Sequence, residues 1–562
     1  MKNLKYILVL IPILVGFAAC SDYLERDPKT DTYLSYEMIF KDVRLAPGFL
    51  NNAYNDLPDG FNRSGSGSMF ASACDEAKHS RSGDMIQFFN NNAISITFNP
   101  DNVWSSMYAG IRKCNIFLKE LDGLITQYNS IPVADRPNFR GQAYFLRAFF
   151  HFELLKRYQN IIYVDKVLDP FNEYEIYSFK QSTFAEAVKL IAQDCDSATA
   201  LLPARLVIDG SHNGRPTKAS SMAVKARMLL YAASPLNNPT NDITLWQQAE
   251  AACKEIYDQR TAFGLNLMTS FSGIFTTPYN AEIIFATQAT NRNDIERANF
   301  PISYQGLGLT NPTQDLVDAF AMNSTYYNDP MNGFNPENPY AGREDRFGAT
   351  ILSNNVIFKD SPVESFVGGK DGLNATVTAT KTGYYLRKFI NPAINLERNE
   401  LSRRPWILYR YGELILNYAE ARNEVLDRPD QLVHDLLNLI RNRARLRPFR
   451  NATEYIQTKE EMREYIKKER RVELAMEEHR FWDLRRWKDA EVVLNKPIKG
   501  MRIERETTGE DSLGNPVYKF NYTVFEVEQR TFDPKLYWYP IPKFELLKYQ
   551  TNGINMVQNP GW

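Results

Sequence analysis

Two long stretches of the 562-residue chain repeat apolar residues every three or four positions, and this period constrains the fold more than any other feature. The first stretch predicts helices over 36–54, 104–127, 139–157, 183–202, 217–233 and 245–259. The second predicts helices over 408–426, 431–445 and 460–487. Because the loops between these segments are rich in Pro, Gly and Asn, we expect consecutive helices to pack as antiparallel pairs.

Side-chain size indicates how the last two helices of the first stretch meet. Small residues such as Ala223, Ala226 and Ala252 lie near bulky ones such as Leu229 and Ile256. Small side chains let helices approach closely, as they do in tetratricopeptide-like pairs. The sequence therefore predicts a mainly α fold built on a tetratricopeptide-like scaffold of helical pairs.

The middle of the chain has a different character. Residues 266–400 are dense in Gly, Pro, Asn and Thr, and short strands are expected at 282–287 and 376–380. Near the carboxyl end, residues 501–527 alternate in polarity around Leu513-Gly514-Asn515, which predicts a β-hairpin. We expect a single domain over 36–562, whose helical scaffold of 36–265 and 401–562 brackets a loop-rich lobe of 266–400 with minor β-hairpins.

The amino terminus has the three regions of a secretory signal peptide. Lys2 and Lys5 precede an apolar run over 6–19, which ends with small residues before Cys20. A helix of this length rises only about 21 Å, short of the ~30 Å hydrocarbon layer. We expect residues 1–19 to be removed, Cys20 to carry lipid, and residues 20–35 to form a lipidated tether, the alternative being an ordinary signal peptide cut elsewhere.

Composition and spacing argue against several function classes. Lys and Arg total 66 against 67 for Asp and Glu, a formal net charge of −1, so nucleic acid is not an expected partner. The five His residues are scattered singly, and neither H-E-x-x-H nor a phosphate-binding glycine loop occurs, so no metal or nucleotide cofactor is expected. Free buried thiols are expected at Cys74, Cys114, Cys195 and Cys253, which have no C-x-x-C spacing.

The run 469–486 alternates Arg with Glu and Asp, a pattern that could be mistaken for a catalytic site. Alternating charges on a helix more often form pairs that lock neighbouring helices together. We therefore interpret this run as a structural network. Paired carboxylates for glycoside hydrolysis are not excluded by the sequence, because any two of many acidic residues can converge in a fold.

Eight segments, together with the lipoprotein-like start, resemble the SusD/RagB family of outer-membrane glycan-binding lipoproteins. They are GQAYFLRAFFHFELLKRY (141–158), NPTQDLVDAF (311–320), NPYAGREDRF (338–347), TKTGYYLRKF (380–389), LYRYGELILNYAEARNE (408–424), ERRVELAMEEHRFWDLRRW (469–487), YPIPKFELLKY (539–549) and QNPGW (558–562). Two positions depart from the family pattern: Glu478 stands where Gly is usual, and Gly412 stands where Ala is more usual.

The resemblance implies a fold and a function. The fold is a helical scaffold of four tetratricopeptide-like units with an inserted lobe. The function is non-enzymatic: a cell-surface lipoprotein of the outer membrane captures oligosaccharides and acts as a lid on a SusC-like TonB-dependent transporter. A peptide-binding lipoprotein with tetratricopeptide-like helices, or less readily a glycoside hydrolase, remains the alternative.

Sugar recognition needs aromatic faces for the C–H side of a ring and planar polar groups for its hydroxyls. Residues 63–92 combine both and resemble the family's ligand loop in position, while 291–304 forms a second such segment that meets the first at one face in the family. The candidate ligand-binding residues are Arg63, His79, Arg81, Asp84, Phe88, Phe89, Phe300 and Tyr304. Packing in the core is the alternative for each aromatic residue, and Trp104 is assigned to packing.

Overall fold

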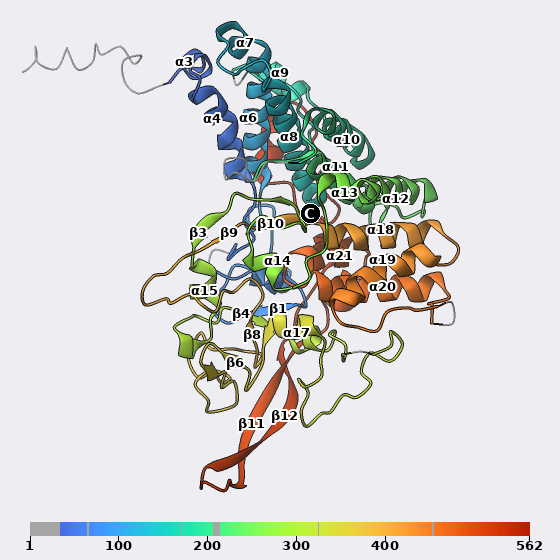
Figure 1. Cartoon of the computed structure of the whole chain (residues 1–562). Coiled ribbons are helices and arrows are strands. Elements are labelled where there is room, and N and C mark those ends of the chain that lie inside the picture. Colours follow the sequence, from blue (N-terminus) through green and yellow to red (C-terminus); the bar gives the residue numbers. More distant parts are fainter. Residues whose placement is uncertain (1–33, 64–66, 170, 206–213, 324, 452–453) are drawn as a thin grey trace, which may run out of the picture.

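The computed structural model describes residues 34–63, 67–169, 171–205, 214–323, 325–451 and 454–562. The expected signal peptide, the lipidated Cys20 and nearly all of the tether therefore lie outside the described residues. The fold is mainly α, as predicted, and helices gather in the upper part of Figure 1 above a loop-rich lower part.

Helices are the main elements of the first half of the chain. Its α-helices are α3 (Tyr36–Lys41), α4 (Leu45–Ala53), α5 (Gln87–Asn90), α6 (Trp104–Asp122), α7 (Leu124–Tyr128), α8 (Arg136–Tyr158), α9 (Glu173–Ser178), α10 (Phe184–Leu201), α11 (Lys218–Ala233), α12 (Ile243–Asp258) and α13 (Arg260–Phe263). Local chemistry fixes several starts: Thr183 and Glu186 form a reciprocal capping box at the start of α10, for example. The helices predicted at 183–202, 217–233 and 245–259 are confirmed within a few residues.

Helices of the second half are short in the lobe and long after it. They are α14 (Gly273–Thr276), α15 (Asp294–Asn299), α16 (Gln314–Val317), α17 (Asp345–Thr350), α18 (Tyr411–Val425), α19 (Gln431–Arg443), α20 (Lys459–Glu473), α21 (His479–Arg486), α22 (Ala490–Val493) and α23 (Lys543–Thr551). Four 3-10 turns are described: η1 (Tyr54–Asp56), η2 (Phe70–Ala73), η3 (Ile302–Tyr304) and η4 (Pro534–Tyr537).

The helical scaffold continues across the inserted lobe. Helices α6, α8, α10, α11 and α12 pack against one another in chain order, and α18 then packs directly on α12 although the whole lobe separates them in sequence. Helices α19 and α20 pack on α18 in turn. The lobe is thus an insertion into one continuous layer of helices, with a hydrophobic core of its own around Phe300, Tyr384 and Phe389.

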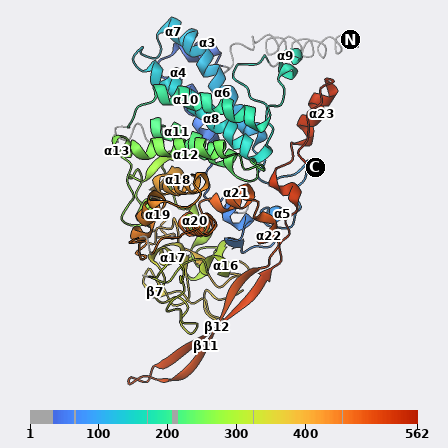
Figure 2. The ribbon, with the colours of Figure 1, turned by 90° about the vertical axis from the view of Figure 1, so that its right-hand side faces the viewer.

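Strands in the described residues form six antiparallel pairs. The pairs are β1 (Ala77–His79) with β4 (Thr310–Pro312), β2 (Ile283–Ala286) with β10 (Ile407–Arg410), β3 (Thr290–Arg292) with β9 (Ser402–Arg404), β5 (Ile351–Leu352) with β8 (Tyr385–Leu386), β6 (Ile357–Phe358) with β7 (Ser361–Pro362), and β11 (Ile498–Glu510) with β12 (Pro516–Glu528). The last pair is the predicted hairpin, which projects far from the body (Figure 2). The strand predicted at 282–287 is confirmed as β2.

Five predicted elements need correction. The helices predicted over 36–54 and 104–127 are each divided, the first into α3 and α4 and the second into α6 and α7. The helix predicted from 408 starts at Tyr411, because the preceding residues pair with β2. The single helix predicted over 460–487 is broken between α20 and α21, where Met476 and Glu478 have left-handed backbone angles. No strand forms at 376–380, where the Thr376 side chain accepts a hydrogen bond from the Ala379 N–H and closes a turn.

Two further findings bear on the site. No helix in the described residues combines the length and apolar character needed to cross a membrane. Cys74, Cys114, Cys195 and Cys253 are free and buried, as predicted. Each of these thiols has a raised pKa because burial disfavours the thiolate.

Candidate functional site

The alternating charges at 469–486 lie in the core as a connected ionic network, which confirms their structural interpretation. Arg410 is at its centre: its guanidinium donates to Glu282 at 2.9 Å, to Glu473 at 2.7 Å and to Glu477 at 2.7 Å. Arg346 adds bonds to Glu473 and to two further carboxylates. Despite burial, which favours the neutral acid, the surrounding guanidinium groups hold the pKa of Glu473 well below its usual value.

This network contains residues of the segments that carry the family resemblance. Arg346 lies in NPYAGREDRF, Lys388 in TKTGYYLRKF, Arg410 in LYRYGELILNYAEARNE, and Glu473 and Glu477 in ERRVELAMEEHRFWDLRRW. Removing one partner of a buried ion pair leaves an uncompensated charge in the core. The segments that best mark the family therefore hold the lobe on the helices, and a ligand site has to be sought elsewhere.

Arg63, predicted to bind ligand, belongs to the buried ionic system instead. Its guanidinium donates to Glu478 at 2.7 Å and pairs with Asp101, and it lies over the Phe70 ring. Asp101 also accepts from Arg157 at 2.8 Å. Although burial favours the neutral acid, these two cations hold the pKa of Asp101 below its usual value. Arg63 therefore anchors the start of the candidate loop to the core.

His79 and Asp84, both within the candidate segment 63–92, contact each other in the interior of the protein. The His79 Nε2 lies 3.1 Å from Asp84 Oδ2, while its Nδ1 accepts the Arg81 N–H at 3.0 Å. Both side chains are fully buried, and burial lowers the pKa of His79, so the ring is neutral at pH 7 with its proton on Nε2. Asp84 also accepts the Ile86 N–H at 2.6 Å. These two predicted site residues stabilise the shape of the loop and do not face solvent.

Two predicted aromatic contacts are core residues. Phe89 packs against Phe70, Phe481 and Tyr539, and Phe300 packs against Phe358 in the core of the lobe. Phe89 is 4% exposed and Phe300 is 0% exposed. Neither ring can stack on a sugar in this conformation, because neither has a face open to solvent. Composition could not separate these two rings from exposed ones.

The first predicted segment pairs with the chain just beyond the second predicted segment. Strand β1 pairs with β4 so that His79 faces Thr310, and the Ser80 N–H donates to the Leu309 carbonyl at 2.9 Å. Arg81 is half-buried just beyond this pairing, and its guanidinium forms no ion pair with a carboxylate of the described residues. Tyr304 is half-buried as well: its hydroxyl donates to the Ser361 carbonyl at 2.8 Å and its ring meets Phe358 edge-on.

Phe88 contacts a residue that lines a cavity, and this cavity was not predicted from the sequence. Its exposed ring contacts the exposed ring of Phe98 at a centroid distance of 4.6 Å. Phe98 lines a cavity of about 440 Å³, together with Phe544 at the start of α23 and the prolines before it. Hydroxyl and amide side chains complete the lining, among them Ser95, Thr97, Asn99, Asn102 and Ser105.

The walls of this cavity are held in place. Residues 95–98 form a tight turn, in which the Ser95 N–H donates to the Phe98 carbonyl at 2.7 Å. The Lys543 N–H donates to the Ile96 carbonyl at 2.9 Å and so joins α23 to this turn. The Asn99 Nδ2 is buried with no hydrogen-bond partner among the described residues. Aromatic faces beside amide and hydroxyl groups are the chemistry that a sugar ring requires.

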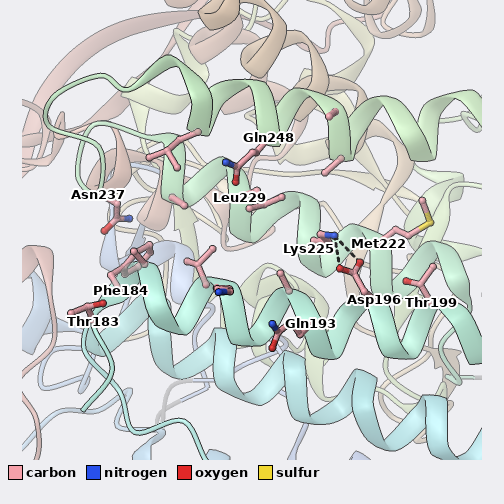
Figure 3. Close-up of a pocket in the computed structure, with 18 of the residues that line it drawn as sticks. Thr183, Phe184, Gln193, Asp196, Thr199, Met222, Lys225, Leu229, Asn237 and Gln248 are labelled. Carbon is pink, nitrogen blue, oxygen red and sulfur yellow. Dashed lines mark hydrogen bonds and ion pairs between the residues drawn. The ribbon is translucent and has the colours of Figure 1, made fainter. Parts of the chain in front are cut away.

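A second, larger cavity lies between helices of the scaffold. It has a volume of about 990 Å³ and is lined by α10, α11 and α12. Figure 3 shows its side chains: Leu229 and Met222 come from α11, Gln193 from α10 and Gln248 from α12. Lys225 of α11 donates to Asp196 of α10 at 2.6 Å within this lining. None of the predicted ligand residues lines this groove.

Within the described residues, no group of three or more His, Cys, Asp or Glu side chains is arranged to hold a metal ion.

Comparison with known sequences identifies the family. Residues 273–562 match the SusD family, and residues 22–230 match a family described as starch-binding and associating with the outer membrane. The first match covers more than half of the chain, so this protein belongs to the SusD family.

Individual relatives are distant but extend over nearly the whole chain. SusD-like protein P38 of Formosa agariphila is 23% identical over 526 residues, which cover 90% of this chain and 96% of that protein. A SusD-like protein of Bacteroides fragilis is 26% identical with a TM-score of 0.75, covering 94% of this chain and 99% of its own. A SusD-like carbohydrate-binding protein of the same species is 23% identical with a TM-score of 0.72, covering 91% and 99%.

Proposed function

We propose that this protein binds oligosaccharides in the cavity between the 95–99 turn and α23, with the adjoining Phe88 surface extending the site. The observation that carries the proposal is the lining of that cavity, where Phe98 and Phe544 stand beside hydroxyl and amide side chains. A volume of about 440 Å³ lies in the range of small-ligand sites, ~300–1,000 Å³. The carbohydrate-binding description of the Bacteroides fragilis relative supports the same ligand class.

Exposure of the aromatic rings is the physical reason for this choice. Phe544 is 66% exposed and Phe98 is 37% exposed, so both have surface that a sugar can cover. Lys548 lies over the Phe544 ring at 4.2 Å, which leaves the other face free for a ligand. Arg81 and Tyr304, which are half-buried residues of the predicted set, are proposed as further contacts.

The biological role proposed is delivery of the bound oligosaccharide to a SusC-like TonB-dependent transporter, without hydrolysis. The protein is proposed to be an outer-membrane lipoprotein anchored through Cys20, in keeping with the family description at 22–230. Release of a Cys20→Ala variant from the membrane fraction, in cells lacking the transporter, would support this anchor. Retention of that variant in the membrane fraction would contradict it.

The binding proposal is tested by titrating neutral malto-, laminari- and xylo-oligosaccharides into the wild-type protein and into Phe544→Ala by calorimetry. Loss of one aromatic face is expected to cost about 0.5–1.5 kcal/mol beyond the lost contact area, so affinity falls several-fold or more. Phe171→Ala is the matched control, because Phe171 is 93% exposed and lies outside the cavity. Equal binding by both variants would place the site elsewhere, and release of shortened sugars would indicate hydrolysis.

A second candidate function is peptide binding in the α10–α12 groove. The observation favouring it is the pairing of an apolar floor with side-chain amides on both walls, Gln193 and Gln248 (Figure 3). Side-chain amides can hydrogen-bond a peptide backbone whatever its sequence. Gln193→Ala with Gln248→Ala would abolish peptide binding on this account and would leave oligosaccharide binding unchanged.

A further inference from the structure

A third cavity, of about 920 Å³, carries an excess of positive charge. It lies where α12 and α13 end, beside the first residue of α18 and the last turn of α19. Four arginines line it: Arg205, Arg260, Arg443 and Arg445. No Asp or Glu is among its lining residues in the described part of the chain. Such a concentration of guanidinium groups needs an explanation, because the chain as a whole is nearly neutral.

Two of the four arginines have carboxylate partners, and these lie outside the lining. Arg443 donates to both Glu282 oxygens at 2.9 Å and also pairs with Glu473, and Arg445 pairs with the exposed Asp345 at 3.1 Å. The Arg443 side chain is only 3% exposed, yet its Nε has no hydrogen-bond partner among the described residues. A buried donor without a partner costs free energy unless something else accepts from it.

The other two arginines bond only to backbone carbonyls in the described chain. Arg260 donates to the Tyr257 carbonyl at 2.7 Å, and Arg205 donates to the Ala262 carbonyl at 2.7 Å. These bonds cap helix ends, but each uses only part of a five-donor guanidinium group and neutralises none of its charge. Arg205 and Arg260 therefore bring into the lining positive charge that no carboxylate of the described residues pairs with.

The remaining lining suits a ligand larger than a bare ion. The Tyr257 ring lies under the Arg260 guanidinium at 4.3 Å, and Tyr411 adds a second aromatic ring. Asn266 and Asn442 supply amides that can bond hydroxyl groups. The volume matches a molecule of a few sugar units, near the upper end of the ~300–1,000 Å³ range of ligand sites.

We propose that this cavity binds the oxyanion group of an acidic saccharide, either a uronate carboxylate or a sulfate ester. Guanidinium groups recognise both oxyanions through paired, charge-assisted hydrogen bonds. The saccharide part of the inference rests on the proposed function, while the oxyanion part rests on the arginines alone. The site is separate from the Phe98–Phe544 cavity, with which it shares no lining residue.

The oxyanion part is tested without any sugar. Crystals of the wild-type protein soaked in selenate, a sulfate analogue with a strong anomalous signal, are expected to show a peak beside Arg260 and Arg443. The peak is expected to disappear in Arg260→Gln. If wild-type crystals show no selenate in the cavity, the proposal is wrong, and Arg205 and Arg260 serve only to cap helix ends.

The saccharide part is tested by calorimetry with galacturonate trisaccharide, a sulfated galactan oligosaccharide and a neutral maltotriose control. Arg260→Gln is expected to weaken binding of whichever acidic sugar fits by about tenfold or more, with neutral sugars unaffected. Arg260→Lys keeps the positive charge but lacks the planar pair of N–H donors. It is therefore expected to bind the acidic sugar more tightly than Arg260→Gln and more weakly than the wild type. Arg502→Gln on the exposed hairpin is the matched control.

The outcomes separate this inference from the proposed function. Loss confined to the carboxylate or to the sulfate identifies the oxyanion that the cavity takes. Equal affinity for acidic sugars in wild type, Arg260→Gln and Arg502→Gln would overturn the inference and leave neutral binding at Phe544 untouched. Selenate bound in the cavity with no sugar bound anywhere would support the oxyanion site and contradict the proposed function.

Discussion

At the scale of single residues, the two departures from the family pattern each have a structural explanation. Glu478 has φ +65°, a left-handed conformation that glycine adopts without strain. Its carboxylate accepts from Arg63 at 2.7 Å, so an ion pair accompanies the strained backbone. Gly412 lies in the first turn of α18, where an added Cβ would meet Arg410 Nη1 at 2.4 Å and Glu282 Oε1 at 2.9 Å. A glycine is therefore required beside the ionic network.

Gly412→Ala is expected to destabilise the protein, although alanine is the better helix former. Arg410 cannot move aside, because it is fully buried and bonded to Glu282, Glu473 and Glu477. We expect a loss of about 1–3 kcal/mol in the free energy of unfolding, measured by urea denaturation. Gly48→Ala, in α4 with nothing within 4 Å of the added Cβ, is expected to gain about 0.5–1 kcal/mol. A stabilising Gly412→Ala would show that the network is not rigid.

The adjacent acids Asp75 and Glu76 have pKa values that are shifted in opposite directions. Although burial favours the neutral acid, Arg471 and Arg480 lower the pKa of Asp75. Glu76 has no such partner: burial, and then the negative charge of Asp75, raise its pKa to about 8. Its Oε1 has no hydrogen-bond partner in the described residues. The folded protein thus holds a proton on Glu76 that the unfolded chain releases near pH 4.5.

A raised pKa in the folded state makes stability fall as pH rises from 4.5 to about 8. Glu76→Gln mimics the neutral acid and removes that dependence. We expect the variant to match the wild type near pH 4.5 and to gain on it by at most about 1.4 kcal/mol per pH unit up to pH 8. Chemical denaturation of both proteins across this range is the measurement. Parallel pH profiles would mean that Glu76 is ionised in the folded state.

At the scale of elements, periodicity predicted most helices and failed where tertiary contacts decide the backbone. The break between α20 and α21 falls inside a continuous helical pattern, and it depends on the left-handed Met476 and Glu478. Segment 376–380 has strand-forming residues but no partner strand, so it forms a turn. The site was harder to predict, because Phe98 and Phe544 come from segments far apart in sequence and composition does not reveal which rings are exposed.

Asp75 connects α20 and α21 to the candidate loop. Arg471 of α20 donates to it at 2.7 Å and Arg480 of α21 donates to it at 2.9 Å. Asp75 itself lies between η2 and β1, and residues 80–90 of the candidate segment 63–92 follow β1. One carboxylate therefore holds both helices against the segment that precedes the candidate site.

Asp75→Asn keeps the shape of this side chain and removes its charge. Two mostly buried guanidinium groups lose their carboxylate, so we expect a loss of about 3–5 kcal/mol in stability. Asp435→Asn, an exposed change on α19, is the control and is expected to stay within about 0.5 kcal/mol. Thermal unfolding compares the two, and oligosaccharide affinity of the folded Asp75→Asn fraction reports on the loop. Similar melting of both variants would show that Asp75 does not clamp the helices.

At the scale of the whole molecule, the residues that stabilise the fold are different from the residues that are proposed to bind ligand. The ionic network ties the lobe to the helical layer, and the three cavities described above are lined mainly by residues outside this network. The family segments in the sequence predicted the frame, because buried ion pairs demand particular residues at particular positions. The family segments did not predict the proposed binding surface. Its exposed rings and amides do not take part in the buried ion pairs, so the ionic network does not determine which residues stand there.

The central claim is that oligosaccharide binds between the 95–99 turn and α23. Hydrogen exchange of the wild-type protein, with and without a saturating oligosaccharide, tests it across the whole chain. We predict that the ligand slows exchange at 95–99 and 540–547, with smaller changes at 81–88. Protection confined to 183–199 and 245–255, which line the α10–α12 groove, would contradict the claim and place binding on the helical scaffold.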